Sequence, residues 1–421
     1  MNVDDNFAIS CRSGKKYGEG GQEKLDDVVI VAAVRTAIGS YGGVFKDLRA
    51  PALTVPVMQE LIRRSEIDPA IIDDVIWGCC YQRTKDETNL ARVAALQAGI
   101  PVEVPGITVH RTCTSGMSSL VMGTQAIKCG DAEVILAGGT ESMSNVPYTI
   151  DELRWGSRMR HIEARDGMWD GLTQLGTGVG MGVTAENVAK KYNISREEQD
   201  EISLQSQQRA VAAIKEGRFN DEIVPVGIPQ RKGDPVYIDK DEHPIDNMTL
   251  EKLAKLPPAF VKGGTVTAGN SSGINDGSAG VLIMSKRTAD RLGIKPLARV
   301  VSYAVAGVDP DYMGIGPVPS TRMALKKTGL TTADIDLFEI NEAFAAQYLA
   351  VEKELGLDRK NTNVNGSGIS LGHPIGCSGI RIVVSLIHEM YKRNLSKGLA
   401  ALCSGGGMGM SVVIEKTPDL S

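Results

Sequence analysis

The last third of the chain repeats, in order, the apolar and turn-forming segments found near its beginning. Expected strands, helices and loops correspond in pairs, and the segments 330–340, 342–355, 372–379 and 399–402 match 67–77, 87–99, 112–116 and 132–137. Such internal similarity is typical of a duplicated structural unit. Because strands alternate with helices in both copies, the pattern predicts an α/β fold with mainly parallel strands. The strand-to-helix loops of the two copies are expected to meet in a shared cleft.

The intervening segment 146–270 has a different composition. It is richer in Arg, Asp, Glu and Gln, and it holds two of the three tryptophans. Helices are predicted from Thr184, as N-cap, to Lys191, and from a capping-box pattern at Ser195 to about Glu216. We interpret this segment as an inserted, mainly helical domain. It separates an N-terminal domain (27–145, completed by about 271–296) from a C-terminal domain (297–421), and residues 1–26 are expected to be a disordered tail.

Charge and cysteine usage exclude several classes of protein. The formal net charge is -5, so nothing indicates a nucleic-acid or membrane surface. No apolar run is long enough to span a membrane. The seven cysteines are scattered without a C-x-x-C pair or metal-ligand spacing, so we predict no metal site. The same usage favours a reducing, cytoplasmic location.

Two cysteines stand at strand ends where sulfur chemistry is favoured. Cys113 follows a short strand and precedes an apolar helix, whose dipole is expected to lower the thiol pKa. Cys403 ends another strand and is followed by three glycines, Gly405 to Gly407, whose backbone N–H groups suit an oxyanion. The alternative for Cys113 is a small buried residue at a turn, and for Cys403 a cysteine beside a flexible turn.

One histidine and one asparagine occupy comparable loops. His373 lies in Gly-His-Pro-Ile-Gly-Cys-Ser-Gly before an amphipathic helix, and it either handles a proton or hydrogen-bonds a carbonyl. Asn341 is expected first as a helix N-cap, and otherwise as a holder of a water or carbonyl near His373. The glycine-rich loop 263–273 would let a ligand approach the backbone. Two thiols, a histidine and an asparagine on such loops suit acyl transfer coupled to carbanion chemistry.

These residues lie in motifs that resemble the thiolase family over residues 27–416. The motifs are C-T-S-G-M at 113–117, N-E-A-F at 341–344, G-H-P-I-G-C-S-G at 372–379 and C-S-G-G-G-M-G at 403–409. Supporting blocks are found at 138–144, 181–187 and 267–273. The resemblance is strongest to acetyl-CoA acetyltransferases. It implies duplicated α/β domains in a layered αβαβα arrangement, with residues 146–270 as a coenzyme A-binding loop domain.

The resemblance also implies a role for each site residue. Cys113 would carry the acyl group, His373 would accept its proton, and Cys403 would act as acid and base at the α-carbon. Asn341 would hold a water in one oxyanion hole, and the N–H groups of Cys113 and Gly405 would form the other. Contacts to coenzyme A are expected from Arg231, Ser272, Met181, Ala268 and Phe344.

The resemblance implies acyl-CoA and coenzyme A as substrates, no permanently bound cofactor, and a homodimer or homotetramer. One departure from the family pattern concerns chain length: Gly180 stands where short-chain members commonly have histidine. A 3-ketoacyl-CoA thiolase of broader chain length is therefore the alternative to an acetyl-CoA acetyltransferase. The second thiol and the inserted domain argue against a ketoacyl synthase. The complete set of four site residues argues against a non-catalytic acyl-CoA-binding protein.

Overall fold

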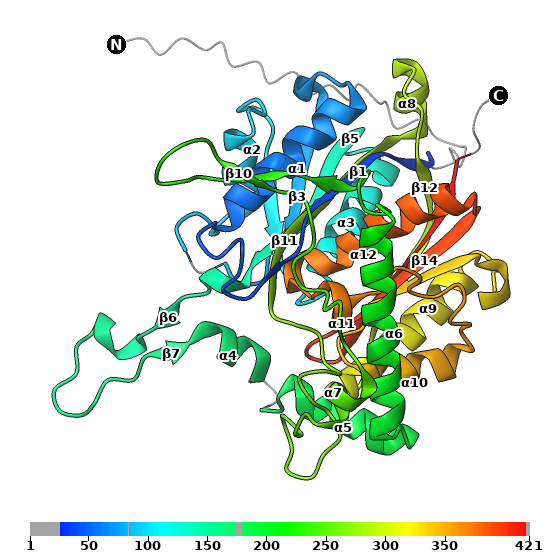
Figure 1. Ribbon diagram of the computed structural model, residues 1–421. Helices are drawn as coiled ribbons and strands as arrows, with labels where there is room; N and C mark the ends of the chain where they lie inside the picture. Colours follow the sequence, from blue (N-terminus) through cyan, green and yellow to red (C-terminus); the bar gives the residue numbers. More distant parts are fainter. Residues whose placement is uncertain (1–25, 83, 174–177, 418–421) are drawn as a thin grey trace.

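The computed structural model describes residues 26–82, 84–173 and 178–417 (Figure 1). The predicted N-terminal tail lies outside these residues, apart from Asp26. The main structure is an 11-stranded sheet with the order β13-β14-β15-β12-β1-β11-β5-β3-β4, to which β2 and β8 are added beside β11 and β1. Two short hairpins, β6–β7 and β9–β10, stand apart from it.

The strands comprise a first half of the sheet, a second half of the sheet and a group of short strands. The first half contains β1 (Val28–Thr36), β3 (Asp74–Gly78), β4 (Gly106–Val109), β5 (Val134–Ser142) and β11 (Asn275–Ser285). The second contains β12 (Ala298–Gly307), β13 (Leu337–Ile340), β14 (Lys397–Ser404) and β15 (Met408–Lys416). The short strands are β2 (Gly39–Ser40), β6 (Tyr148–Thr149), β7 (Arg165–Asp166), β8 (Ile223–Val224), β9 (Val226–Ile228) and β10 (Val236–Ile238).

The two halves of the sheet share one topology. In the first half β3 and β5 are parallel, and β11 then runs antiparallel to both β5 and β1. In the second half β13 and β14 are parallel, and β15 runs antiparallel to both β14 and β12. The halves meet where β1 pairs with β12 over only two residue pairs. The duplication inferred from the sequence is thus present in the strand order.

The prediction of mainly parallel strands is wrong. The strand β11 lies between β1 and β5 in the first half, and β15 lies between β14 and β12 in the second. Both run antiparallel to their neighbours over long registers, so the sheet is mixed. An apolar run shows that a strand is buried on both faces, but it does not show the direction of its neighbour.

Helices cover the sheet and fill the space between its halves. The longer helices are α1 (Ala50–Ser65), α2 (Leu90–Gln97), α3 (Ser115–Cys129), α5 (Met181–Tyr192), α6 (Arg196–Lys215), α9 (Pro317–Lys326), α10 (Ala345–Leu355) and α12 (Ile375–Arg393). The shorter ones are α4 (Gly167–Thr173), α7 (Leu250–Ala254), α8 (Lys286–Leu292) and α11 (Gly368–Leu371), together with 3₁₀ turns at 69–71, 143–145, 151–154, 310–315 and 332–334. The helices α1 and α9 occupy equivalent places, since α1 packs on β1 and β11 and α9 on β12 and β15.

The helices α3 and α12 pack against each other at the centre of the molecule (Figure 1). Nearly every residue of α12 from Ile375 to Met390 is buried, including the charged Arg381 and Glu389, because other elements surround this amphipathic helix. Side chains of both helices share one core cluster with the two sheet halves. The loops that precede these two helices carry Cys113 and His373, so this packing positions the site.

Two helix starts in the inserted segment test the predicted caps. The capping box at Ser195 is confirmed: Ser195 N donates to Glu198 Oε2 at 2.7 Å, and Glu198 N donates to Ser195 Oγ at 3.1 Å. The prediction of Thr184 as an N-cap is wrong, because α5 begins at Met181. The Thr184 hydroxyl instead donates to the carbonyl oxygen of Met181 within the helix, at 2.7 Å.

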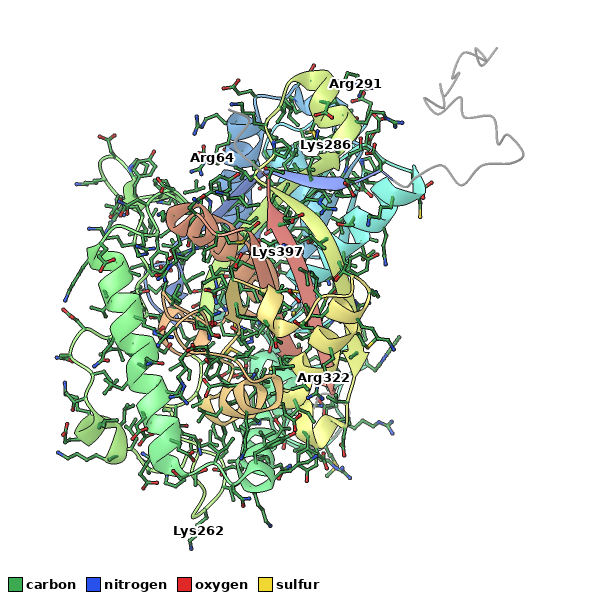
Figure 2. The ribbon with its side chains drawn as sticks, turned by 90° about the vertical axis from the view of Figure 1, so that its right-hand side faces the viewer. Arg64, Lys262, Lys286, Arg291, Arg322 and Lys397 are labelled. Carbon is green, nitrogen blue, oxygen red and sulfur yellow. The ribbon has the colours of Figure 1, made fainter. Side chains whose placement is uncertain are left out.

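The segment from β6 to α4 projects away from the rest of the molecule (Figure 1). We call residues 148–166 the arm. On other surfaces, basic side chains are spread out: Figure 2 shows Lys286 and Arg291 at one end of the molecule, Lys262 at the other and Lys397 between them. Within the described residues, no helix combines the length and apolar character needed to cross a membrane.

Candidate active site

The turn that carries Cys113 has a strained backbone. Thr112 has a φ of 42°, a left-handed conformation that is unusual for a β-branched residue. Its hydroxyl is hydrogen-bonded to the Ser404 hydroxyl and lies 3.1 Å from the carbonyl oxygen of Gly405. The Ser404 hydroxyl also donates to the carbonyl oxygen of Arg111, at 2.9 Å. These contacts hold the turn of Cys113 against the loop that follows Cys403.

Burial controls the protonation of both thiols. It raises the pKa of Cys113 to about 11, although the backbone N–H groups of Gly405 and of Cys113 itself stabilise the thiolate. Burial also raises the pKa of Cys403, and a charge on the nearby Cys113 raises it further. The prediction of a lowered Cys113 pKa is therefore wrong. A helix dipole contributes only about 0.3–1 kcal/mol, and the loss of solvent around the sulfur outweighs it.

His373 is fixed on both its backbone and its ring. Its N–H donates to Asn275 Oδ1 at 2.9 Å, and its Nδ1 lies 2.6 Å from Ser378 Oγ. Because the Ser378 hydroxyl donates its proton to the carbonyl oxygen of Pro374, at 2.9 Å, it accepts from Nδ1–H. The proton then resides on Nδ1, and Nε2 carries the free lone pair.

The His373 ring is neutral at physiological pH. Burial, and then the positive charge of Arg381, lower its pKa to about 3. A neutral imidazole with a free Nε2 accepts a proton as a general base. The proton-handling interpretation of His373 agrees with this environment. Among the described residues, the partners of the ring nitrogen Nδ1 are the side chains of Ser378 and Asn341 and not a backbone carbonyl.

Asn341 faces the same histidine. Its Nδ2 lies 3.5 Å from His373 Nδ1, and the residue is fully buried. Among the described residues its Oδ1 has no hydrogen-bond partner. The first expectation, a helix N-cap, is wrong because the N-cap of α10 is Phe344.

Glycines allow the nucleophile and histidine loops to meet. A β-carbon added at Gly116 would lie 2.8 Å from the carbonyl oxygen of Gly376, and one at Gly139 would lie 2.2 Å from the same atom. One at Gly379 would lie 2.8 Å from Met117 N and 3.4 Å from the carbonyl oxygen of Cys113. We call these four residues, Gly116, Gly139, Gly376 and Gly379, the glycine crossing. It brings the first turns of α3 and α12 into backbone contact.

The carboxylate of Glu141 joins the two halves beside this crossing. Its oxygens accept hydrogen bonds from the backbone N–H groups of Cys80, Tyr81 and Gly376, at 3.0, 3.1 and 2.9 Å. Burial raises the pKa of Glu141 to about 7, and those N–H groups oppose the rise. Sequence reasoning missed Glu141, Asn275 and Ser378. A signal was present for Ser378, which follows His373 by five residues in the same motif, and for Glu141, the charged residue of the buried strand β5.

Four of the five predicted coenzyme A contacts lie near Cys403. Met181 and Phe344 share an apolar cluster with it. The loop that holds Ala268 and Ser272 runs beside Phe344, since Ser272 N donates to the carbonyl oxygen of Ala343 at 2.9 Å. Arg231 is not brought to this group. It is exposed in the turn between β9 and β10, and Figure 1 shows that hairpin far from α5 and α7.

Family models match nearly all of the described chain. The model described as "Thiolase, N-terminal domain" matches residues 28–287, and "Thiolase, C-terminal domain" matches residues 294–416. An acetyl-CoA acetyltransferase of Pseudomonas aeruginosa is 52% identical over 397 residues, which cover 93% of this chain and 100% of that protein.

Solved structures agree with these matches. The crystal structure of the Bacillus anthracis acetyl-CoA acetyltransferase is 53% identical with a TM-score of 0.92, covering 93% of this chain and 99% of its own. The human mitochondrial 3-ketoacyl-CoA thiolase in complex with CoA is 46% identical with a TM-score of 0.90, covering 94% and 99%.

Proposed function

Because the chain belongs to the thiolase family, we propose that it is an acetyl-CoA C-acetyltransferase. It condenses two molecules of acetyl-CoA to acetoacetyl-CoA and CoA, or catalyses the reverse thiolysis. The names of relatives at about half identity support this activity. The observation that carries the proposal is that Cys403 interacts electrostatically with Cys113 from the opposite half of the fold. The start of the helix that follows the neutral His373 also packs on the turn of Cys113.

In thiolysis, Cys113 attacks the C3 carbonyl of acetoacetyl-CoA while Nε2 of His373 takes the thiol proton. Such assistance is required because the raised pKa of Cys113 keeps it a neutral thiol. The C2–C3 bond then breaks, and its electron pair remains on C2 of the departing acetyl-CoA. Cys403 donates its proton to C2, a role that suits a thiol whose pKa is raised.

The second half of the reaction restores both thiols. The sulfur of CoA attacks the Cys113 thioester, and its proton passes to Cys403. The leaving Cys113 sulfur regains its proton from His373. Condensation is the same sequence in reverse, so the reaction is ping-pong in both directions.

Backbone and amide groups stabilise the oxyanions. The N–H groups of Cys113 and Gly405 already bind the Cys113 sulfur, which supports their role at the adjacent acyl oxygen. The buried Oδ1 of Asn341 has no hydrogen-bond partner within the described residues, which supports its role in holding a water for the other oxyanion. Loss of one such donor typically costs about 3–4 kcal/mol of transition-state stabilisation.

Coenzyme A is proposed to approach along the apolar cluster that contains Met181, Phe344 and Cys403, with Ser272 and Ala268 beside it. The distant position of the β9–β10 hairpin does not support Arg231 in this site. No permanently bound cofactor enters the mechanism.

We also propose that the domain boundaries follow residues 145, 270 and 296.

We also propose a homodimer or homotetramer in the cytoplasm, acting in lipid metabolism. Large apolar side chains on the arm support self-association, because Leu153, Trp155 and Met159 are 56%, 92% and 86% exposed. The free cysteines of the described chain support a reducing compartment.

A broader 3-ketoacyl-CoA thiolase is the second candidate. Gly180 favours it, because among the described residues a β-carbon added there would have only Thr173 Cγ2 within 4 Å, at 3.9 Å. Within the part of the chain that the structure describes, the position that commonly holds histidine in short-chain members is therefore open.

The two cysteine roles are tested by following each half-reaction. Cys113→Ala is expected to abolish covalent acetylation by acetyl-CoA, measured by mass spectrometry of the intact protein. Cys403→Ala is expected to become acetylated but not to exchange deuterium into the methyl group of acetyl-CoA. Cys129→Ala, which changes an exposed cysteine, is the control and should behave as the wild type. Acetylation without Cys113, or normal exchange without Cys403, contradicts the proposal.

A further inference from the structure

Three consecutive titratable residues of the inserted segment, Asp241, Glu242 and His243, lie against the first half of the fold. The two carboxylate oxygens of Asp241 accept hydrogen bonds from the guanidinium of the buried Arg35, at 2.7 and 2.9 Å. One oxygen of Glu242 accepts from the backbone N–H of Ser40 at 2.8 Å. These contacts hold the two carboxylates in place. The histidine that follows them makes contacts of a different kind.

The His243 ring joins the turn at Ser40 to the short helix that leads into His373. Its Nδ1 lies 3.5 Å from Ser40 Oγ, and the ring also hydrogen-bonds the backbone of Ile369. Ile369 belongs to α11, which ends two residues before His373. Burial lowers the pKa of His243, and the charge of Glu242 and the bond to Ile369 oppose this. A bond that favours the protonated ring is one in which the ring donates to a carbonyl.

A second route from His243 to His373 passes through Asn275. The Oδ1 of Asn275 accepts from the backbone N–H of His373 at 2.9 Å, and its Nδ2 donates to the carbonyl oxygen of Gly39 at 3.0 Å. A β-carbon added at Gly273 would lie 2.7 Å from that Oδ1 and 2.4 Å from His243 Cε1. The imidazole and the amide therefore lie against the same glycine, and a displaced His243 ring leaves room for Asn275 to move.

We propose that His243 is a positioning residue for His373, because its ring supports both α11 and Asn275. This inference rests on the proposed role of His373 as the base that takes the Cys113 proton. Proton transfer requires donor and acceptor within about 2.6–3.2 Å, so a small shift of the His373 loop lowers its rate. The apolar cluster proposed to guide coenzyme A lies elsewhere, since it contains neither His243 nor Asn275. Substrate binding is therefore expected to change little.

The kinetic test compares His243 variants in the thiolysis of acetoacetyl-CoA. His243→Ala should lower kcat by about 10- to 100-fold, the effect of a slightly misplaced catalytic group, with KM nearly unchanged. His243→Gln keeps an N–H donor for the backbone of Ile369 and should restore most of the loss. Glu242→Ala is the matched control, because it removes the neighbouring contact to Ser40 but not the contact to Ile369, and it should keep the wild-type kcat.

Alkylation of cysteines by iodoacetamide separates positioning from general loosening of the fold. Labelling of Cys113 and of the fully buried Cys377 is followed at pH 7 by mass spectrometry of peptides. If His243 positions the base, His243→Ala should alkylate Cys113 more slowly than the wild type and leave Cys377 unlabelled. If the ring only stabilises the fold, its loss should expose both cysteines and speed the labelling of both.

The outcomes distinguish the inference from the proposed function. Wild-type kcat in His243→Ala, faster labelling of both cysteines, or an equal loss of kcat in Glu242→Ala overturns the inference. If His243→Ala does not fold, His243→Gln is compared with His243→Phe, which keeps a ring without a donor. A higher kcat in His243→Gln then supports the inference, and equal values overturn it. Absence of any thiolysis in the wild type overturns the proposed function instead.

Discussion

The tautomer of His373 depends on a single hydroxyl. Ser378 Oγ gives its own proton to Pro374 and therefore accepts from Nδ1–H of the ring. Without that acceptor, the ring proton has no fixed place, and the fraction of molecules with a free Nε2 falls. Because the ring is buried and neutral, water does not substitute freely for the lost partner. The hydroxyl therefore acts on catalysis through the histidine, without reaching the substrate.

Replacement of this hydroxyl should lower turnover more than substrate binding. Ser378→Ala is expected to reduce kcat for thiolysis by about tenfold, the effect of one lost buried hydrogen bond, with KM nearly unchanged. Ser378→Thr keeps a hydroxyl and should restore most of the activity. Ser385→Ala, in the same helix, removes a buried hydroxyl that contacts Glu222 and serves as control. An unchanged kcat in Ser378→Ala would show that Ser378 does not set the tautomer.

At the scale of elements, the glycine crossing decides whether α3 and α12 can meet. Side chains at these positions would enter the backbone of the partner helix or of β5. A β-carbon at Gly376 would lie 2.6 Å from Glu141 Oε2 and 2.7 Å from the carbonyl oxygen of Thr140. Neither the strand backbone nor the hydrogen-bonded carboxylate is free to move away.

Gly376→Ala should therefore destabilise the protein and misplace the His373 loop. We expect a loss of about 1–3 kcal/mol in the free energy of unfolding, as for overpacked cores, together with reduced turnover. Gly307→Ala is the control, because the nearest atom to its β-carbon is the carbonyl oxygen of Gly407 at 4.0 Å. Urea unfolding and thiolysis assays check both variants. Wild-type stability of Gly376→Ala would mean that the crossing tolerates a side chain.

The sequence predicted the elements better than their environment. Apolar periodicity located the strand before Cys113, the helix after it and the helix after His373, because those patterns are local. The direction of β11 and β15 could not be predicted, since it depends on which strands they meet after long intervening segments. The caps assigned to Thr184 and Asn341 failed because both helices start at other residues.

Properties that depend on distant contacts were also beyond the sequence. The pKa of Cys113 follows from burial by segments from both halves of the chain. Glu141 gained its role only when the turn at Cys80 and the start of α12 supplied N–H groups to it. The contacts between the Thr112 turn and the Ser404 loop likewise join residues far apart in the chain.

At the scale of the whole molecule, charged side chains are buried deep inside the fold. Arg35 is fully buried and pairs with Asp241 and Glu222, at 2.7 and 2.5 Å. Arg381 and Glu339 are also buried, and the electrostatic interaction between them is the main attraction that offsets their loss of solvent. Burial raises the pKa of Glu339 to about 8, and the charge of Arg381 opposes this rise.

Glu339 should make the protein less stable as the pH rises. Its folded pKa exceeds its ordinary value of 4.5, so the folded state binds the proton more tightly. Its contribution to stability is complete below about pH 4.5 and is lost as the pH approaches 8. Relative to the wild type, Glu339→Gln should gain stability from pH 5 to pH 8, by at most about 1.4 kcal/mol per pH unit.

Urea unfolding of both proteins at pH 5, 6.5 and 8 measures this difference. Glu103→Gln, at an exposed position, is the control and should follow the wild type at each pH. Parallel curves for Glu339→Gln and the wild type would show that Glu339 has the same proton affinity in the folded and unfolded states.

The glycine crossing has a consequence for the exchange of halves between related proteins. At the glycine crossing, each half presents backbone without side chains. Only a partner half that also lacks side chains at its contact positions can pack against this backbone. A chimaera that joins residues up to β11 of this chain to the second half of a homologue would inherit a working centre only if the homologue is equally bare at the equivalents of Gly376 and Gly379. The two halves must therefore evolve together. A recombinant of two lineages keeps a working centre only if it retains glycine at all four of these positions.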